Sequence, residues 1–196
     1  MSAFKPLLPW PRADSSEMLI DYVLDQLNLA GVESTVVVAG NREGDVRTHL
    51  ERVGGAGVVV VTNDAFFLGK AGSVRVGVAA SDLSLDALIV IGVDQPRPAW
   101  MLRAVLEAHA GLQAPISLPT YRGTWGHPPV FARHLRDQLL SVREETQGLR
   151  PVVRGQYPHV QEVPVDSPIA LLNLNTRADY LRGMEQFEMD RRLADN

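Results

Sequence analysis

Apolar residues recur at helical spacing in several stretches of the chain and form short continuous runs between them. Ile20, Val23 and Leu27 lie on one face of a predicted helix that ends at Gly31. Continuous β-branched runs are typical of strands buried in a parallel sheet. The pattern then predicts a strand at 35–39, a helix around 46–53, a strand at 58–62, a helix within 69–80, a strand at 87–93 and a helix at 98–111.

The second half of the chain continues this alternation less regularly. It contains a predicted strand at 114–118, a loop rich in glycine and proline at 119–129, and a helix marked by Phe131, Leu135 and Leu139. Short strands are expected at 160–165 and 169–174, followed by a helix that the capping-box sequence Thr176 to Asp179 begins. Strands alternating with helices predict a three-layer αβα sandwich with a mostly parallel sheet and antiparallel later strands, formed by residues 1–196 as one domain.

The apolar run at 87–93 ends abruptly at Asp94-Gln95-Pro96. In open α/β sheets, ligands bind beyond the carboxyl ends of the strands, so Asp94 is expected to project into a binding site. The alternative is that Asp94 caps the turn into the next helix, as short polar residues before proline often do. The pattern alone leaves both interpretations open.

Composition narrows the class of protein. Hydrophobic residues make up 45% and charged residues 21% of the chain, and no apolar run approaches the roughly 20 residues that span a bilayer. The net charge of −4, without a basic run, argues against nucleic acid as the main partner. The absence of cysteine excludes disulfides and cysteine-based zinc or nucleophilic chemistry. With no secretory signal in the N-terminal pattern, we expect a cytoplasmic protein without a membrane partner.

Lysine is rare among the basic residues. Only Lys5 and Lys70 are lysines, whereas seventeen positions are arginine. Because lysine presents a compact point charge, such isolated lysines indicate places that face a phosphate, although an arginine-rich genome produces the same bias.

Four short segments carry the remaining candidate chemistry: Lys5 to Pro9, Asp94 to Pro96, Gly126 to Pro128 and Asn173 to Thr176. In this order and spacing they resemble the MobA-like nucleotidyltransferases, the group that includes the molybdenum cofactor cytidylyltransferases and guanylyltransferases. The likeness extends from Lys5 almost to the C-terminus. Two weaker segments share it, namely Asn63 with Gly69, Ser73 and Gly77, and the degenerate turn Gln147 to Arg150.

The resemblance implies a Rossmann-like fold of the kind found in nucleotide-diphospho-sugar transferases. It also implies Mg²⁺-dependent transfer of a nucleotidyl group from CTP or GTP to a phosphorylated small acceptor such as molybdopterin, with release of pyrophosphate. The implied catalytic residues are Lys5 and Asp94. The implied ligands are Asn63, Gly69, Ser73, Gln95 and Lys5 for the nucleotide, Gly126, His127 and Arg150 for the acceptor, and Asp94, Asn173 and Asn175 for the metal.

Each of these residues also has an ordinary structural interpretation. Lys5 is then a solvated terminal lysine, His127 braces its loop, Ser73 caps a helix and Gly69 is a hinge. The asparagines satisfy the backbone at a strand end, where alternation lets at most one of them face Asp94. Arg150 pairs on the surface with Glu144 or Glu145.

The largest departure from the family lies at the front of the chain. Family members begin with a strand and a loop of the type Ala-Ala-Gly-x-Ser-x-Arg-Met-Gly, but here Ser2-Ala3-Phe4 stands directly before Lys5. An empty central slot is expected to leave two strand edges unpaired. The chain therefore begins further upstream, or another segment fills the slot, or the protein is a decayed relative that acts as a binding module, for example with molybdoenzyme maturation proteins. A sugar-phosphate nucleotidyltransferase is a further alternative, and the asparagines at 173 and 175 favour either the guanylyltransferase or the sugar-nucleotide pattern.

Overall fold

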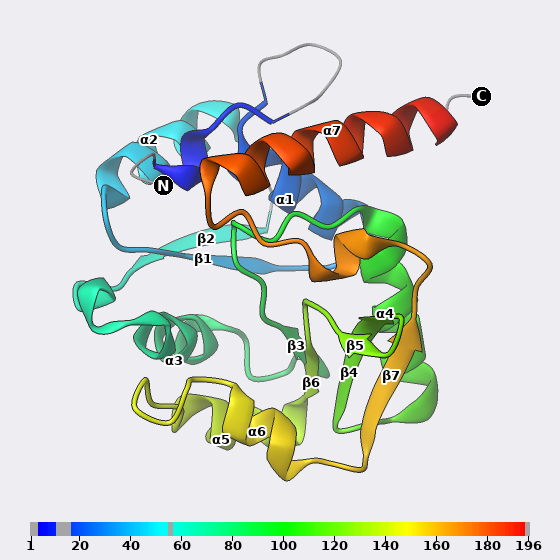
Figure 1. Cartoon of the computed structure of the whole chain (residues 1–196). Coiled ribbons are helices and arrows are strands. Elements are labelled where there is room, and N and C mark those ends of the chain that lie inside the picture. Colours follow the sequence, from blue (N-terminus) through cyan, green and yellow to red (C-terminus); the bar gives the residue numbers. More distant parts are fainter. Residues whose placement is uncertain (1–3, 11–16, 55–56, 195–196) are drawn as a thin grey trace.

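The computed structural model describes residues 4–10, 17–54 and 57–194. Helices cover both faces of two adjoining β-sheets, which gives the three layers expected from the sequence (Figure 1). One face is covered by α1 (Leu19–Leu29), α2 (Glu43–Val53) and α4 (Ala99–Leu112), and the other by α3 (Lys70–Ala80), α5 (Arg136–Leu140) and α6 (Arg150–Gly155). The last helix, α7 (Arg177–Ala194), packs beside the N-terminal segment and the start of α1.

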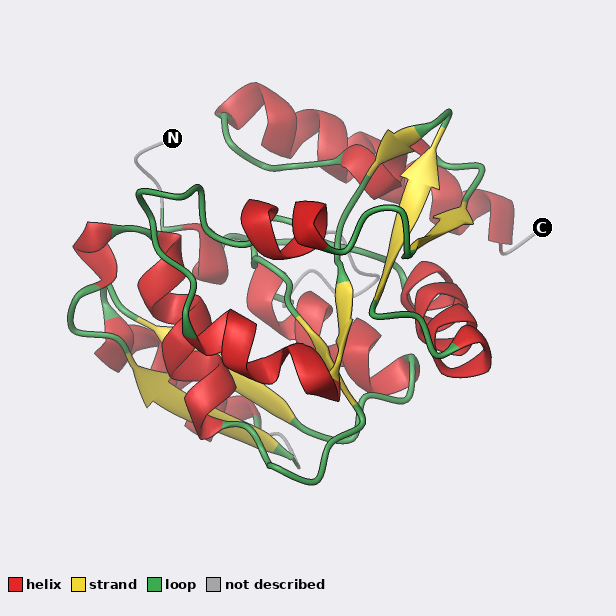
Figure 2. Cartoon of the chain, turned by 90° about the horizontal axis from the view of Figure 1, so that it is seen from below, coloured by secondary structure: helices red, strands yellow, loops and turns green. Residues whose placement is uncertain are grey.

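The strands form two sheets that Figure 2 shows from below. In the first, β1 (Thr35–Ala39) pairs in parallel with β2 (Val58–Thr62). The second has the order β3 (Ala87–Ile89), β6 (Val130–Ala132), β4 (Ile116–Tyr121), β5 (Thr124–Trp125), with β7 (Val160–Pro164) parallel to β4. β6 is antiparallel to β3 and β4, and β5 is antiparallel to β4. The sequence predicted a mostly parallel sheet with antiparallel later strands, and only part of this is confirmed. β1 and β2 are parallel, but β3 pairs only with the antiparallel β6 among the described strands, and the last strand, β7, is parallel to β4.

The two sheets adjoin without hydrogen bonding to each other. β1 pairs only with β2 and β3 only with β6, so each strand keeps one edge without a partner strand among the described residues. Val93, just beyond β3, nevertheless packs in the same apolar cluster as Val37 of β1. The run from Ala87 to Val93 is therefore half-buried rather than buried on both faces, and its regular strand ends at Ile89. Both differences occur in the strand whose second edge has no partner strand among the described residues.

The predicted helix through Phe131 was wrong at its start. Phe131 lies in β6, where it is opposite Leu88 on one side and Ile116 on the other, and the helical part begins only with the 3₁₀ turn η3 (Arg133–Leu135). The spacing from Phe131 to Leu135 imitates one helical face because both side chains enter the same core cluster, from a strand and a helix in succession.

The predicted strand at 169–174 was also wrong. Pro168 begins the 3₁₀ helix η4 (Pro168–Leu171), and the Ser167 hydroxyl accepts a hydrogen bond from the Ile169 backbone N–H. The capping box that follows is confirmed. The Thr176 backbone N–H donates to the Asp179 carboxylate at 2.8 Å and the Asp179 backbone N–H donates to Thr176 Oγ1 at 3.1 Å, which begins α7 at Arg177.

The described helices include none that is both long and apolar enough to cross a membrane.

A buried histidine links α4 to β4 and predicts a pH-dependent stability. Burial lowers the pKa of His109 below its usual 6.5, and its Nδ1 lies 3.0 Å from Ser117 Oγ. The unfolded chain therefore binds the proton more readily than the folded chain does. The contribution of neutral His109 to the free energy of unfolding is fully present above pH 6.5 and is lost as the pH falls from 6.5 through the lowered pKa. We expect His109→Gln to flatten the fall in unfolding free energy below pH 6.5, by at most about 1.4 kcal/mol per pH unit. Urea unfolding at several pH values measures this, and identical slopes in both proteins would contradict it.

Candidate functional site

Two lysines meet one aspartate at the carboxyl edge of the second sheet. Lys5, in the 3₁₀ turn η1 (Lys5–Leu7), donates from Nζ to Asp94 Oδ2 at 2.9 Å. Nζ of Lys70, the first residue of α3, lies 3.9 Å from the same oxygen. These are the only lysines of the chain. They come from segments far apart in sequence, so the fold concentrates the compact positive charges at one carboxylate.

The segment that carries Lys5 is held in place by aromatic packing. Trp10 is 2% exposed, and its ring centroid lies 5.9 Å from Tyr22, 5.9 Å from Tyr180 and 5.3 Å from Phe187. The Tyr180 hydroxyl also donates to the Pro9 carbonyl. α1 and α7 thus fix the segment between them, and Lys5 is not the solvated terminal lysine of the alternative interpretation.

The turn that presents Asp94 is closed by its neighbour Gln95. The Gln95 backbone N–H donates to the Gly92 carbonyl at 2.9 Å, and Gln95 Oε1 accepts from the Gly92 backbone N–H at 3.2 Å. A Cβ at Gly92 would lie 2.6 Å from Asp94 Oδ1, so a larger residue at position 92 would displace the carboxylate from this position. The described contacts of the Asp94 side chain are with lysines, whereas Gln95 performs the turn-closing role that the alternative assigned to Asp94.

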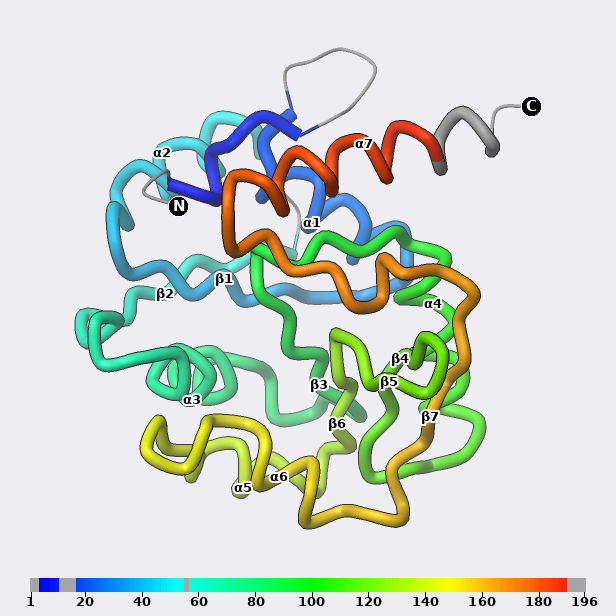
Figure 3. The backbone as a smooth tube through the Cα atoms, in the orientation of Figure 1, coloured from blue at the N-terminus to red at the C-terminus, as the bar shows by residue number. Residues whose placement is uncertain are grey.

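Gln95 also connects the turn to the closing motif. Its Nε2 donates to Asn173 Oδ1 at 2.7 Å, and the Leu174 backbone N–H donates to the Asp94 carbonyl at 2.8 Å. The two segments therefore run side by side, green and orange in Figure 3. Asn175 is exposed and contacts Asn173 through its backbone. Of the two asparagines, the described contacts bring the side chain of Asn173 alone to the Asp94 turn.

The sequence prediction missed Arg97, which holds three segments of the site together. Its guanidinium donates to four backbone carbonyls: His127 at 2.9 Å, Pro96 at 2.8 Å, Ala170 at 3.0 Å and Leu172 at 2.9 Å. The residue is 0% exposed, and burial lowers the pKa of Arg97 to about 10. The only signal in the sequence was its place directly after Asp94-Gln95-Pro96, among many other arginines.

The loop of Gly126 and His127 is braced through its backbone. The His127 backbone N–H donates to the Ala170 carbonyl at 3.1 Å, and a Cβ at Gly126 would lie 2.4 Å from that carbonyl oxygen. Burial lowers the pKa of His127, and the positive charges of Arg97 and Lys70 lower it further against the opposite effect of the nearby carboxylate. The lowered pKa favours the neutral form of the ring. A role in acceptor binding stays a prediction.

A hydrogen bond between Asn63 and Ser73 connects the loop after β2 to the first turn of α3. Asn63 is buried, its Nδ2 donates to Ser73 Oγ at 3.0 Å, and its Oδ1 accepts from the Ala65 backbone N–H at 3.1 Å. Ser73 lies inside α3, so the alternative of a helix cap at Ser73 was wrong. These contacts fix the loop between β2 and α3, and binding of a nucleotide by either side chain stays a prediction.

The end of α3 near Lys70 is capped by an acidic side chain from another segment. Glu144 Oε2 accepts from the Ala71 backbone N–H at 2.9 Å. Gly69 has φ 111°, and a Cβ there would lie 2.3 Å from the Glu144 carboxyl carbon. The close approach of Glu144 and the positive φ together explain why position 69 is glycine.

Arg150 lies away from the lysine pair in the described contacts. It is exposed at the start of α6, and its Nη1 donates to Gln147 Oε1 at 3.0 Å. The surface-pair alternative was right about exposure but wrong about the partner, since Glu144 caps α3 instead. No described contact joins Arg150 to Asp94, and its role toward an acceptor stays a prediction.

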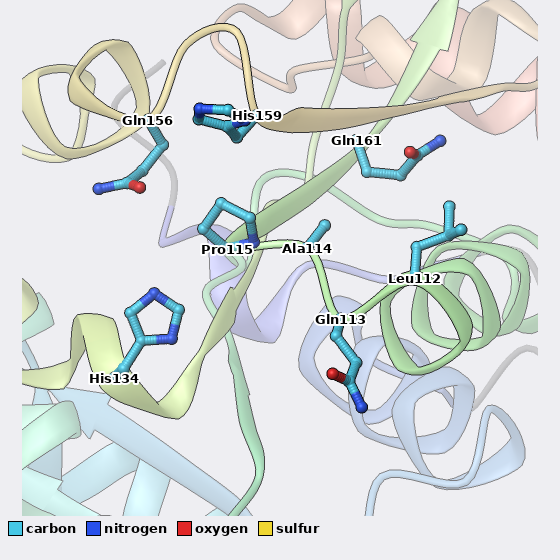
Figure 4. A pocket seen from close by; sticks show the side chains of 8 residues that line it. All are labelled: Leu112, Gln113, Ala114, Pro115, His134, Gln156, His159 and Gln161. Carbon is cyan, nitrogen blue, oxygen red and sulfur yellow. The ribbon is translucent and has the colours of Figure 1, made fainter.

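A pocket lies at the opposite edge of the sheet. About 500 Å³ in volume, it opens where β4 and β7 begin and is lined mainly by amide and imidazole side chains, including Gln113, His134 and His159 (Figure 4). Because β3 and β4 are both antiparallel to β6, this edge is the amino edge, whereas Asp94 lies at the carboxyl edge. The pocket is therefore separate from the site formed by Lys5, Lys70 and Asp94.

The donor set at Asp94 fits a hard cation that is shared with phosphate. Among the residues described, no group of three or more His, Cys, Asp or Glu side chains forms a metal cage. Mg²⁺ is usually held by one or two carboxylates together with substrate phosphates and water rather than by an all-protein cage. The Asp94 carboxylate, with the Asn173 amide oxygen linked to it through Gln95, meets that requirement.

Comparison with known proteins identifies the family. The family model described as the MobA-like NTP transferase domain matches residues 1–163, and the chain belongs to this nucleotidyltransferase family. A comparison with curated proteins gives no match.

Solved structures agree with this assignment. The crystal structure of Rv0371c from Mycobacterium tuberculosis is 25% identical, with a TM-score of 0.75 over 94% of this chain and 90% of that one. A nucleotidyl transferase from Methanothermobacter thermautotroptrophicus is also 25% identical, with a TM-score of 0.76 over 95% and 86%. The manganese complex of Rv0371c is 27% identical, with a TM-score of 0.74 over 92% and 91%. The Rossmann-like nucleotidyltransferase fold is thereby confirmed.

Proposed function

We propose that this protein is a metal-dependent nucleotidyltransferase that moves CMP or GMP from the triphosphate to a phosphorylated small acceptor such as molybdopterin. An oxygen of the acceptor phosphate forms a bond to the α-phosphorus of the nucleotide. The bond between that phosphorus and the oxygen bridging to the β-phosphate breaks, and pyrophosphate leaves. Because the reaction gathers phosphate charge without a covalent enzyme intermediate, it needs positioned cations more than a nucleophile.

The observation that carries this proposal is the convergence of Lys5 and Lys70 on Asp94 at the carboxyl edge of the sheet. Their ammonium groups supply the positive charge that the triphosphate and the leaving pyrophosphate require. His127, whose backbone carbonyl accepts a hydrogen bond from Arg97 and whose pKa is lowered by burial, is suited to contact the acceptor without adding charge. Gln95 and Arg97 hold the surrounding backbone, so little reorganisation is needed during transfer.

We further propose that the metal is Mg²⁺ or Mn²⁺, held by Asp94 with the Asn173 amide oxygen nearby. When bound, such an ion neutralises charge across the triphosphate and the leaving pyrophosphate. Support comes from the buried Asp94 carboxylate beside two cations, and from the relative Rv0371c, one of whose solved structures is a manganese complex. We place the reaction in the cytoplasm.

The test is formation of product with defined substrates. The purified chain is incubated with CTP, GTP, ATP or UTP, with Mg²⁺ or Mn²⁺, and with molybdopterin or a sugar 1-phosphate, and pyrophosphate release is measured. We expect release with one nucleotide and one acceptor class, and loss of at least about 100-fold in Asp94→Asn. Full activity in Asp94→Asn contradicts the site, whereas consumption of the sugar phosphate alone favours the sugar-nucleotide alternative.

A second candidate is a non-catalytic binding module, because β1 and β3 each have one edge with no partner strand among the described residues. The phosphate-binding loop that precedes the lysine in family members has no counterpart in residues 4–10, and positions 1–3 lie outside the described residues. Clear turnover by the 196-residue chain excludes this candidate. A folded chain that binds no nucleotide supports it.

A further inference from the structure

Three consecutive large apolar side chains are exposed in the turn that directly precedes Gly69 and Lys70. In the 3₁₀ turn η2 (Phe66–Leu68), Phe66 is 42%, Phe67 73% and Leu68 67% exposed. Phe67 has the highest exposed fraction of the large hydrophobic side chains that the structure describes. Exposed apolar clusters of this kind mark binding surfaces more often than isolated exposed residues do.

Several contacts hold the backbone of this turn, although its side chains are exposed. The Phe66 backbone N–H donates to the Asn63 carbonyl at 3.2 Å, and Asn63 itself is locked to α3 through Ser73. A Cβ at Gly40, just beyond β1, would lie 2.4 Å from Phe66 Cβ, so the absence of a side chain at position 40 lets Phe66 seat there. The Phe67 ring meets Phe66 edge to face, with centroids 5.9 Å apart and an interplanar angle of 83°. Phe66 is thus the anchored ring and Phe67 the presented one.

The turn lies close in sequence to Lys70, one of the two lysines that we propose to face the phosphates. Lys70 follows Phe67 by three residues, which span at most about 10 Å, and its Nζ lies 3.9 Å from Asp94 Oδ2. That reach is comparable with the ribose and phosphates that separate a base from a metal-bound phosphate. The turn also follows β2 at the carboxyl edge, where ligands of α/β sheets bind.

We propose that Phe67 is the stacking platform for the base of the donor nucleotide, with Phe66 holding its ring in position. This inference rests on the proposed function, because it places the base by reference to phosphates at Lys5, Lys70 and Asp94. An aromatic ring stacks on any base, so the contact supplies affinity and leaves the choice of base to other groups. A protein interface or a lipid surface is a weaker fit, since neither accounts for an anchored aromatic pair three residues from a lysine at the site.

The experiment compares a ligand that has a base with one that lacks it. Binding of CTP, GTP and inorganic tripolyphosphate, each with Mg²⁺, is measured by calorimetry for the wild type and for Phe67→Ala. We expect the alanine variant to bind the preferred nucleotide about tenfold more weakly and tripolyphosphate unchanged. Phe67→Tyr keeps a ring and is expected to restore nucleotide affinity. Leu83→Ala, at a leucine that is also 67% exposed but lies between α3 and β3, is the matched control and is expected to change neither ligand.

The outcomes separate this inference from the proposed function. Wild-type binding of tripolyphosphate with Mg²⁺ that Asp94→Ala abolishes, together with an unchanged nucleotide affinity in Phe67→Ala, overturns the stacking inference alone. A wild-type chain that binds neither ligand overturns both. A Phe67→Ala variant that loses self-association or binding to anionic vesicles, with unchanged nucleotide affinity, assigns the turn to an interface or a membrane and also overturns the inference.

Discussion

Replacing Arg97 by methionine is expected to lower the free energy of unfolding by about 3–5 kcal/mol. The guanidinium is fully buried and donates to four backbone carbonyls, which belong to the Asp94 turn, the His127 loop and the segment before α7. Without it these carbonyls lose their donor inside the protein, where an unsatisfied polar group is costly. Urea unfolding of the two proteins measures the difference.

Two further variants make this prediction specific. Arg97→Lys keeps the charge but presents fewer donors without the planar fork, so we expect it to recover only part of the loss. Arg103→Met removes an exposed arginine that donates to a single carbonyl, that of Leu29 at 2.6 Å, and should cost under about 1 kcal/mol. Equal losses in the Arg97 and Arg103 variants would show that the four-carbonyl network is not what stabilises the site.

Lys5→Ala is expected to change metal binding and catalysis in opposite directions. Lys5 Nζ occupies the Asp94 oxygen at 2.9 Å, so a metal ion alone must compete with it. Removing this cation should raise the affinity for free Mn²⁺ about tenfold, because charges this close repel strongly even when partly screened. The same change should lower the rate of nucleotidyl transfer about 100-fold or more, because the phosphates lose a positioned cation.

Lys70 provides the matched control for Lys5. Its Nζ is 3.9 Å from Asp94 and its side chain is 88% exposed, so Lys70→Ala should change free Mn²⁺ affinity less than Lys5→Ala does. Mn²⁺ titration followed by electron paramagnetic resonance measures affinity without requiring activity. An unchanged Mn²⁺ affinity and an unchanged transfer rate in Lys5→Ala would show that Lys5 has no role in metal binding or catalysis.

The sequence predicted the regular elements well where one apolar pattern, helical or continuous, extends over the whole element. The helix before Gly31 and the strands at β1 and β2 follow directly from their apolar patterns. Phe131 was misplaced because a strand followed by a helix presented apolar residues at helical spacing. The segment at 169–174 was misassigned because its backbone carbonyls are satisfied by Arg97, from 73 and 75 residues away, and not by a neighbouring strand.

The candidate site was predictable only in part. Asp94, Gln95 and Asn173 could be proposed from short motifs, since each lies where a strand or loop ends at the carboxyl edge. Arg97 could not be found, because burial of an arginine against carbonyls leaves no periodic pattern in the sequence. Phe67 could not be predicted either. Three consecutive apolar residues normally indicate a buried segment, and their exposure is known only from the structure.

The most direct test of the central claim is a thermal-shift titration of the 196-residue chain with CTP, GTP, ATP and UTP, each with and without Mg²⁺. The account predicts a rise in melting temperature that requires the metal, favours one nucleotide and disappears in Asp94→Ala. A cooperatively folded chain that shows no shift with any nucleotide, or one whose shift persists in Asp94→Ala, would contradict a metal-nucleotide site at Asp94.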